Sequence, residues 1–157
     1  MVIETVKTYV VENPPPHRGG YNWVLLKLVT DDGTEGLGEA YGVPYDPDVI
    51  ARMIRDVGTR HVVGRDPFDV ETLWREIYVG SADTHTPHHP DLTTPAIISA
   101  FEMACFDIVG KTVSQPVYNL LGGQVHDKLR SYTYLYPADP TDDTFDVFTD
   151  PDRAASR

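Results

Sequence analysis

The segment FEMACFDIVGKTVSQPVYNLLGG, residues 101–123, decides the fold of this 157-residue chain. Extended back to Thr94, its pattern predicts a helix over 94–111 that carries apolar side chains on nearly every side. A surface helix has one apolar stripe, whereas a helix that is apolar all round is buried between partners. We therefore predict a central core helix. Its partners have to come from the rest of the chain.

Two polar features of this helix have structural interpretations. Asp107 and Lys111 are four residues apart, the spacing at which opposite charges on a helix pair, so we predict an ion pair at the helix end and no catalytic role. Cys105 lies on the apolar face, where a thiol packs as a small hydrophobe. It is the one cysteine of the chain and cannot form an internal disulfide, which favours a reducing cytoplasm.

The amino-terminal third predicts a sheet. Residues 2–12 alternate between apolar and polar, and residues 21–30 are rich in strand-forming types. The prolines and glycines of NPPPHRGG, residues 13–20, require a loop between these strands. An Asp-Gly turn at 31–34 leads to EGLGEAYG, 35–42, whose glycines indicate close backbone approach or a bulge. The three segments predict an antiparallel meander.

Helix signals follow the predicted sheet. Asp46-Pro47-Asp48 supplies a capping side chain and a first-turn proline before a helical stretch that runs to 62. Asp66-Pro67 supplies the same two signals, a capping side chain and a proline. They precede a stretch in which Phe68, Leu73, Trp74 and Ile77 have helical spacing. Residues 81–92 are polar and contain prolines, hence a loop, and a short helix after Pro116 should stop at Gly122-Gly123.

The carboxy-terminal residues predict the beginning of a second domain. LRSYTYLY, residues 129–136, has the composition of a strand, and Thr149-Asp150-Pro151 is a helix start. We therefore expect an α+β domain over 1–128, with a three-stranded meander followed by a helical bundle. Residues 129–157 would be the first strand and helix start of a truncated α/β domain, which makes the chain a fragment.

Charge limits the classes of partner. Asp and Glu number 24 against 13 Lys and Arg, a formal net charge of −11. Nucleic acid is a poor partner because phosphate binding needs a basic footprint, and anionic membranes are disfavoured for the same reason. No apolar run reaches the length of a membrane span. The acidity is typical either of an ordinary acidic protein or of a protein from a high-salt cytoplasm, where salt screens the repulsion.

Motifs for cofactors and metals are weak. The glycines of EGLGEAYG lack GxGxxG spacing, and no GxSxG elbow or P-loop is present. His85, His88 and His89 cluster in HTPHH, but without CxxC or HExxH spacing, so a solvated loop or contact with an anionic substrate is favoured over a metal site. We assign no catalytic residue and no metal ligand to this chain.

Three stretches resemble a known family: TDDGTEGLGEAYG (30–42), GRDPFDVETLW (64–74) and residues 101–123. They resemble the amino-terminal capping domain of the enolase superfamily, in its mandelate racemase/muconate lactonizing enzyme group. Within that group they are most similar to sugar-acid dehydratases of the galactonate and gluconate kind. The resemblance covers residues 2–136. It departs at Glu102, Phe106 and Ser114, where relatives often have Asp, Trp and Gly.

The resemblance implies a function. In this family the capping domain packs against a (β/α) barrel of the same chain, and that barrel supplies a Lys or His base and the carboxylates that hold Mg²⁺. Those positions lie beyond Arg157. The expectation is a cap without its barrel, inactive by itself and binding no Mg²⁺, from a cytoplasmic homo-oligomer that dehydrates a sugar acid. The alternatives are a stand-alone binding module that kept the cap fold, or the cap of a racemase or cycloisomerase.

The resemblance also implies two loops that reach the barrel mouth, at 17–22 and 41–45. Their side chains suit a polyhydroxy acid, because Arg18 offers a donor fork to a carboxylate, Asn22 donates and accepts, and tyrosines present hydroxyls. The alternative is that the tyrosines only flank strands and the arginine is solvated. The predicted substrate-binding residues are His17, Arg18, Tyr21, Asn22, Tyr41 and Tyr45, followed by His85 and His88.

Overall fold

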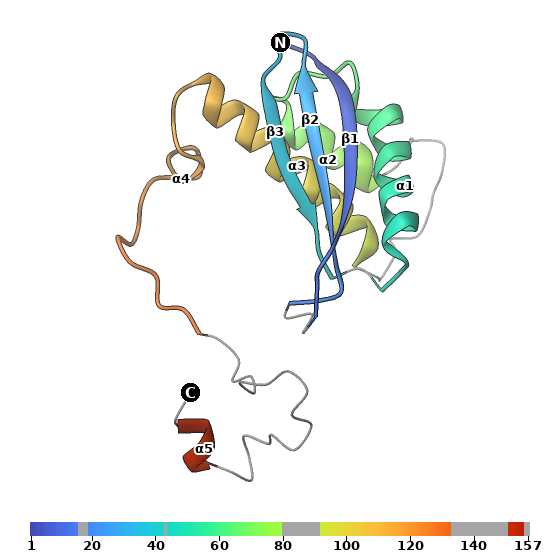
Figure 1. The fold of residues 1–157 in the computed structure, drawn as a ribbon. Helices are drawn as coiled ribbons and strands as arrows, with labels where there is room; N and C mark the ends of the chain where they lie inside the picture. The colour runs from blue at the N-terminus through green and yellow to red at the C-terminus, as the bar shows by residue number, and fades with distance from the viewer. Residues whose placement is uncertain (16–18, 43, 80–91, 133–150, 156–157) are drawn as a thin grey trace.

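The computed structural model describes residues 1–15, 19–42, 44–79, 92–132 and 151–155. Its first element is an antiparallel sheet of β1 (Ile3–Glu12), β2 (Asn22–Thr30) and β3 (Glu35–Ala40), in the order β1-β2-β3. The register pairs Tyr9 with Leu25 and Leu25 with Glu39. One face of this sheet is covered by helices, and the other faces the viewer uncovered in Figure 1. The predicted meander is confirmed.

The helices follow in sequence: α1 (Pro47–Val57), the π-helical turn η1 (Gly58–Val62), α2 (Val70–Val79), α3 (Thr93–Thr112), α4 (Val117–Leu120) and α5 (Pro151–Ala155). The Asp46 carboxylate accepts a hydrogen bond from the Asp48 N–H at 2.9 Å, which caps α1 as predicted. The expected helix through 62 changes to π winding after Val57. Gly58 lies there directly against Val6 of β1, a tertiary contact that helical spacing does not report.

Helix α2 begins later than its sequence signal. The Asp66 carboxylate accepts from the Phe68 N–H at 3.0 Å, so it closes a turn, and the helix starts at Val70. Phe68, which has helical spacing with Leu73 and Ile77 in the sequence, lies before the helix and is 48% exposed. Leu73 and Ile77 are buried, as their spacing predicts.

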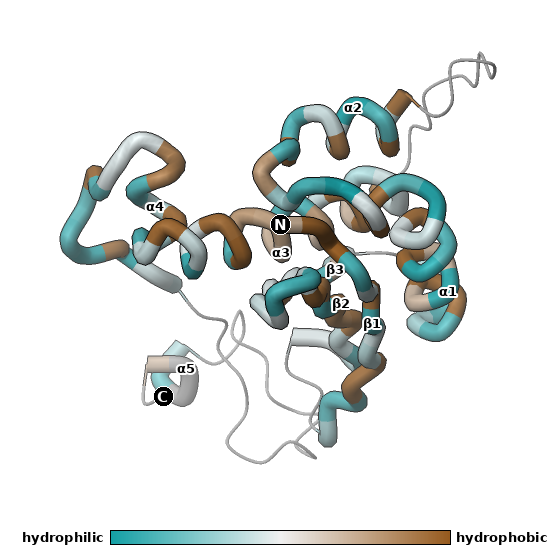
Figure 2. Tube along the Cα trace, turned by 90° about the horizontal axis from the view of Figure 1, so that it is seen from above, coloured by the Kyte–Doolittle hydropathy of each residue, from teal (hydrophilic) through white to brown (hydrophobic). Residues whose placement is uncertain are grey.

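Helix α3 has apolar residues all round because it packs on two sides. It lies between the sheet and α2, as the view along the sheet shows (Figure 2). Ile97, Phe101, Ala104 and Ile108 are each 2% exposed or less. Together with residues of the sheet and α1 they form one core, which includes Ile3, Leu26, Leu28, Ile50, Ile54, Val62 and Leu73. The prediction of a buried central helix is confirmed.

Strand β3 touches α3 backbone to backbone. A Cβ placed on Gly36 would overlap the carbonyl oxygen of Ala104, and one placed on Gly38 would overlap that of Ala100. Both glycines are buried, and both face alanines on the helix. Of the two predictions for these glycines, close approach is therefore the correct one.

The last described segments agree in part with prediction. Gly122 and Gly123 have φ of 110° and 99°, and the Gly123 N–H bonds to the Tyr118 carbonyl at 2.8 Å, which ends α4 as expected. Ser114 has a φ of 55°, in the left-handed region. Residues 129–132 form no strand, because a strand needs a hydrogen-bonded neighbour and none of the described strands pairs with them. The rest of that predicted strand lies outside the described residues, and the boundary at 128 stays a prediction.

Candidate functional site

The candidate site lies at one end of the sheet, the lower end in Figure 1. The β1–β2 connection and the segment between β3 and α1 both emerge there. The strand register sets this geometry, since Glu12 pairs with Asn22 and Val24 pairs with Ala40. The residues that follow β1 and β3 therefore lie at the same end of the sheet as the residues that precede β2.

The base of the β1–β2 connection is held by Asn13. Its N–H bonds to the Tyr21 carbonyl at 2.8 Å, and its side-chain amide donates to the Gly20 carbonyl at 2.6 Å. Gly19 and Gly20 have φ of 90° and 131°, which side chains other than glycine rarely adopt. A Cβ on Gly19 would lie 3.2 Å from the Trp23 ring, so this loop packs on the indole.

The structure places four of the predicted substrate-binding residues at or beside this end. Tyr21 is 71% exposed, Tyr41 is 70% exposed and Tyr45 is 53% exposed, and Asn22 is exposed at the start of β2. Tyr45 directly precedes Asp46, the cap of α1. The other four, His17, Arg18, His85 and His88, lie outside the described residues. Substrate contact by any of them stays a prediction.

Beside this end is a hollow of about 420 Å³, lined by Trp23, Glu39, Tyr41, Ala96, Ser99 and Met103. The first three residues lie on the uncovered side of the sheet, and the last three form a stripe on α3. Tyr41 was predicted for the site, but Glu39 and Trp23 were missed. The available signal was the alternation of β3, which places Glu39 on the same face as Tyr41.

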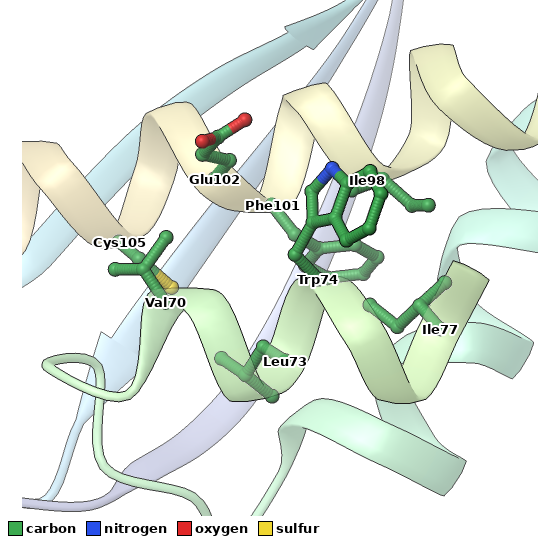
Figure 3. Close-up of a pocket in the computed structure, with 8 residues that line it drawn as sticks. All are labelled: Val70, Leu73, Trp74, Ile77, Ile98, Phe101, Glu102 and Cys105. Carbon is green, nitrogen blue, oxygen red and sulfur yellow. The ribbon is translucent and has the colours of Figure 1, made fainter. Parts of the chain in front are cut away.

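A second, much smaller gap lies between α2 and α3 (Figure 3). Its volume of about 10 Å³ is at the lower limit for one water molecule, and its walls are mostly apolar. Cys105 lines it, and burial, with a smaller effect of the Glu102 charge, raises the pKa of the thiol to about 12. The thiol is protonated at neutral pH, which agrees with the structural role expected for it.

The predicted Asp107–Lys111 ion pair is present and also fastens β3. The Lys111 Nζ lies 2.8 Å from the Asp107 carboxylate. That carboxylate accepts from the Leu37 N–H at 3.0 Å, while Lys111 donates to the Glu35 carbonyl at 2.7 Å. The pair therefore forms hydrogen bonds to backbone groups on the outer edge of the first half of β3, which is a structural role.

The described residues offer no candidate metal centre. Within the ranges that the structure describes, no three His, Cys, Asp or Glu side chains gather closely enough to hold an ion. Helix α3 has the length and apolar composition of a membrane span, yet more than half of it is buried in the core, as in the central helix of a globular domain. Its apolar surface is used for packing.

Comparison with known proteins agrees with this architecture. Residues 6–122 match the family described as mandelate racemase/muconate lactonizing enzyme, N-terminal domain. The chain belongs to this family. The mandelate racemase/muconate lactonizing enzyme fold is also found in a crystal structure of the enzyme of that name from Jannaschia sp. CCS1, with a TM-score of 0.85 and 40% identity. The match covers 99% of this chain and 39% of that one.

Curated relatives within this mandelate racemase/muconate lactonizing enzyme family include dehydratases. The chain is 36% identical over 115 residues to a D-galactonate dehydratase family member of Streptomyces bingchenggensis. It is 31% identical over 121 residues to the D-xylonate dehydratase of Haloferax volcanii. The alignments cover 73% and 77% of this chain but only 26% and 27% of the relatives, so the chain spans about a quarter of their length.

Proposed function

We propose that this chain is the capping, substrate-specificity domain of a Mg²⁺-dependent sugar-acid dehydratase, inactive without a barrel domain. The named relatives support the reaction class, and the family match supports the role of an amino-terminal domain. The observation that carries the proposal is the convergence of Tyr21, Asn22 and Tyr41 at one end of the sheet, with side chains turned to solvent. Core packing does not account for such exposed aromatic residues.

Dehydration of a sugar acid removes the proton next to the carboxylate and expels a neighbouring hydroxyl group. Mg²⁺ would supply charge stabilisation for the intermediate anion. The described residues contain no ligand set for it, so the proposal places the metal ligands and the base outside this domain. The cap contributes by binding: the hydroxyls of Tyr21, Tyr41 and Tyr45 and the amide of Asn22 can bond to substrate hydroxyls and cover them from water.

A chimaera tests this proposal. Residues 1–128 would replace the corresponding domain of the Streptomyces bingchenggensis relative, and kcat/KM would be measured over a panel of aldonic acids. We expect an active enzyme whose order of preference differs from that of the parent, because the cap residues that read the far end of the substrate have changed. A folded chimaera that keeps the parent's order of preference would contradict the specificity role.

The 157-residue chain by itself is the matched control. We expect it to dehydrate no aldonic acid in the presence of Mg²⁺, since the described residues offer no metal site and the proposal places the base in the barrel domain. Dehydration by the purified chain, free of host enzyme, would contradict the placement of the chemistry outside the cap.

A further inference from the structure

The two halves of the outer edge of β3 differ in whether their backbone groups are hydrogen-bonded. The N–H of Leu37 points away from β2 and bonds to Asp107, and the carbonyl of Glu35 points the same way and bonds to Lys111. Backbone groups alternate in direction along an antiparallel strand, so the N–H and C=O of Glu39 also point to this edge. In the part of the chain that the structure describes, no group forms a hydrogen bond to the N–H or the C=O of Glu39.

The uncovered half of the edge faces the 420 Å³ hollow. Glu39 lies on its sheet side, and Ala96, Ser99 and Met103 form its floor on α3, at spacings of three and four residues that place them on one stripe. At about 3.3 Å per residue, the edge from Leu37 to Tyr41 accommodates a strand of about four residues. The hollow thus combines unpaired strand groups with space beside them.

We propose that the Glu39 half of β3 is a strand-addition site, which binds an extended peptide with a Lys or Arg opposite Glu39. The peptide backbone would bond to the Glu39 N–H and C=O. Its residue opposite Glu39 would share the uncovered face of the sheet, and its two neighbours would point inward over Ala96 and Ser99. The site therefore favours alternation of basic and small apolar residues.

Charge distinguishes this occupant from a second copy of the chain. Glu39 makes no ion pair with any described residue, so a basic side chain would provide its first counter-charge. Two copies pairing through the same edge about a two-fold axis would bring their Glu39 carboxylates together, and like charges on neighbouring strands repel. The net charge of −11 also disfavours self-association, because two copies of the chain repel each other.

The test uses the ¹⁵N-labelled 157-residue chain and an acetylated, amidated seven-residue peptide of alternating valine and lysine. We expect the Glu39 amide signal to shift on titration and its hydrogen exchange to slow. E39K should weaken binding of this peptide about tenfold, because an attraction becomes a repulsion, and should strengthen binding of the valine–glutamate counterpart. S99F should block both peptides by filling the hollow without a change of charge.

Two controls separate strand addition from simple charge attraction. E12K makes the same charge change on β1, the opposite edge strand, and should leave affinity for the valine–lysine peptide unchanged. The same peptide N-methylated at alternate residues lacks the donors for the β3 edge and should not bind. Equal binding of the methylated peptide or of spermidine would overturn the proposal, and so would a dimer of the chain that excludes the peptide.

Discussion

The two ends of the sheet are built in different ways. At the upper end in Figure 1, β2 and β3 are joined by the turn 31–34, in which the Thr30 N–H bonds to the Thr34 carbonyl at 3.0 Å and the Asp32 carboxylate accepts from two groups. At the lower end the connections carry exposed tyrosines and border a hollow. At the first end the polar side chains of the turn bond within the turn, whereas at the second end the tyrosine rings lie exposed.

A similar contrast is found along strand β3. The side chains of Asp107 and Lys111 reach the first half of β3 but not its second half. In this six-residue strand, Glu35 and Leu37 bond to side chains of α3, while Glu39 lies beyond Gly38 in the half proposed for ligand binding. Substitutions at the two ends should separate stability from binding.

The largest effect is expected at Gly38, between the two ends. G38A would press a Cβ into the Ala100 carbonyl of α3, and neither backbone can move without disturbing the core. We expect a loss of roughly 3 kcal/mol or more in unfolding free energy, at the upper end of the range for overpacked sites. Chemical denaturation followed by circular dichroism measures it.

Gly42 provides the matched control at the lower end. It has a φ of 75° and nothing within 4 Å of a Cβ, so G42A meets only backbone strain. Its expected cost is about 1 kcal/mol. Equal losses for G38A and G42A would show that β3 and α3 are not in backbone contact.

The next effect concerns binding at the lower end. In the active chimaera, N22A should lower kcat/KM for the preferred sugar acid about tenfold, a loss of about 1.4 kcal/mol, because one donor and one acceptor are removed from the substrate. R18A should act in the same direction. The melting temperature should stay unchanged for N22A, since Asn22 is exposed. N119A, at an exposed position of α4, is the control. Unchanged kinetics in both N22A and R18A would show that the loop 17–22 does not contact the substrate.

A smaller effect is expected at the fastened half of β3. D107A removes the acceptor of the Leu37 N–H and the partner of Lys111, and should cost about 1 kcal/mol of unfolding free energy. Hydrogen exchange at Leu37 should accelerate. D56A removes a similar pair, between Asp56 of α1 and Arg60 of η1, that has no bond to the sheet, and should cost less than half as much. Equal costs would mean that the link to β3 contributes nothing.

Sequence patterns predicted those features that depend on neighbours along the chain. The all-round apolarity of α3 indicated its central position, the four-residue spacing of Asp107 and Lys111 indicated their pair, and Asp46 indicated the start of α1. The glycines of β3 indicated either close approach or a bulge, and not which helix would be approached. Each of these follows from helix or strand periodicity, or from a local backbone requirement.

Features that depend on distant segments were missed. Gly58 of the π-helical turn lies against Val6 of β1, and the hollow is lined by residues of the sheet and of α3 that are far apart in the sequence. Residues 129–132 have the composition of a strand but pair with none of the described strands, and the rest of the predicted strand lies outside the described residues. In the site, the family resemblance grouped Tyr21 with Tyr41, whereas the alternation of β3, which places Glu39 on the face of Tyr41, was not used.

The smallest effect is expected at the turn of the upper end, and it should depend on pH. The Thr30 hydroxyl bonds to the Asp32 carboxylate at 2.6 Å and the Thr34 N–H bonds to it at 3.0 Å. These bonds, that from Thr30 first, lower the pKa of Asp32 below its usual range. A carboxylate with a lower pKa in the folded state stabilises the fold above its unfolded-state pKa, and this contribution is lost as pH falls through the folded-state value.

D32A should therefore lower the melting temperature at neutral pH by a small amount, and the difference from the parent chain should shrink at an acid pH below the folded-state pKa of Asp32. D127A, an exposed aspartate after α4, should show no difference at either pH. If D32A were equally destabilised at both pH values, its effect would come from turn conformation and not from the charge of the carboxylate. The charge of Asp32 would then play no part in the contrast between the two ends.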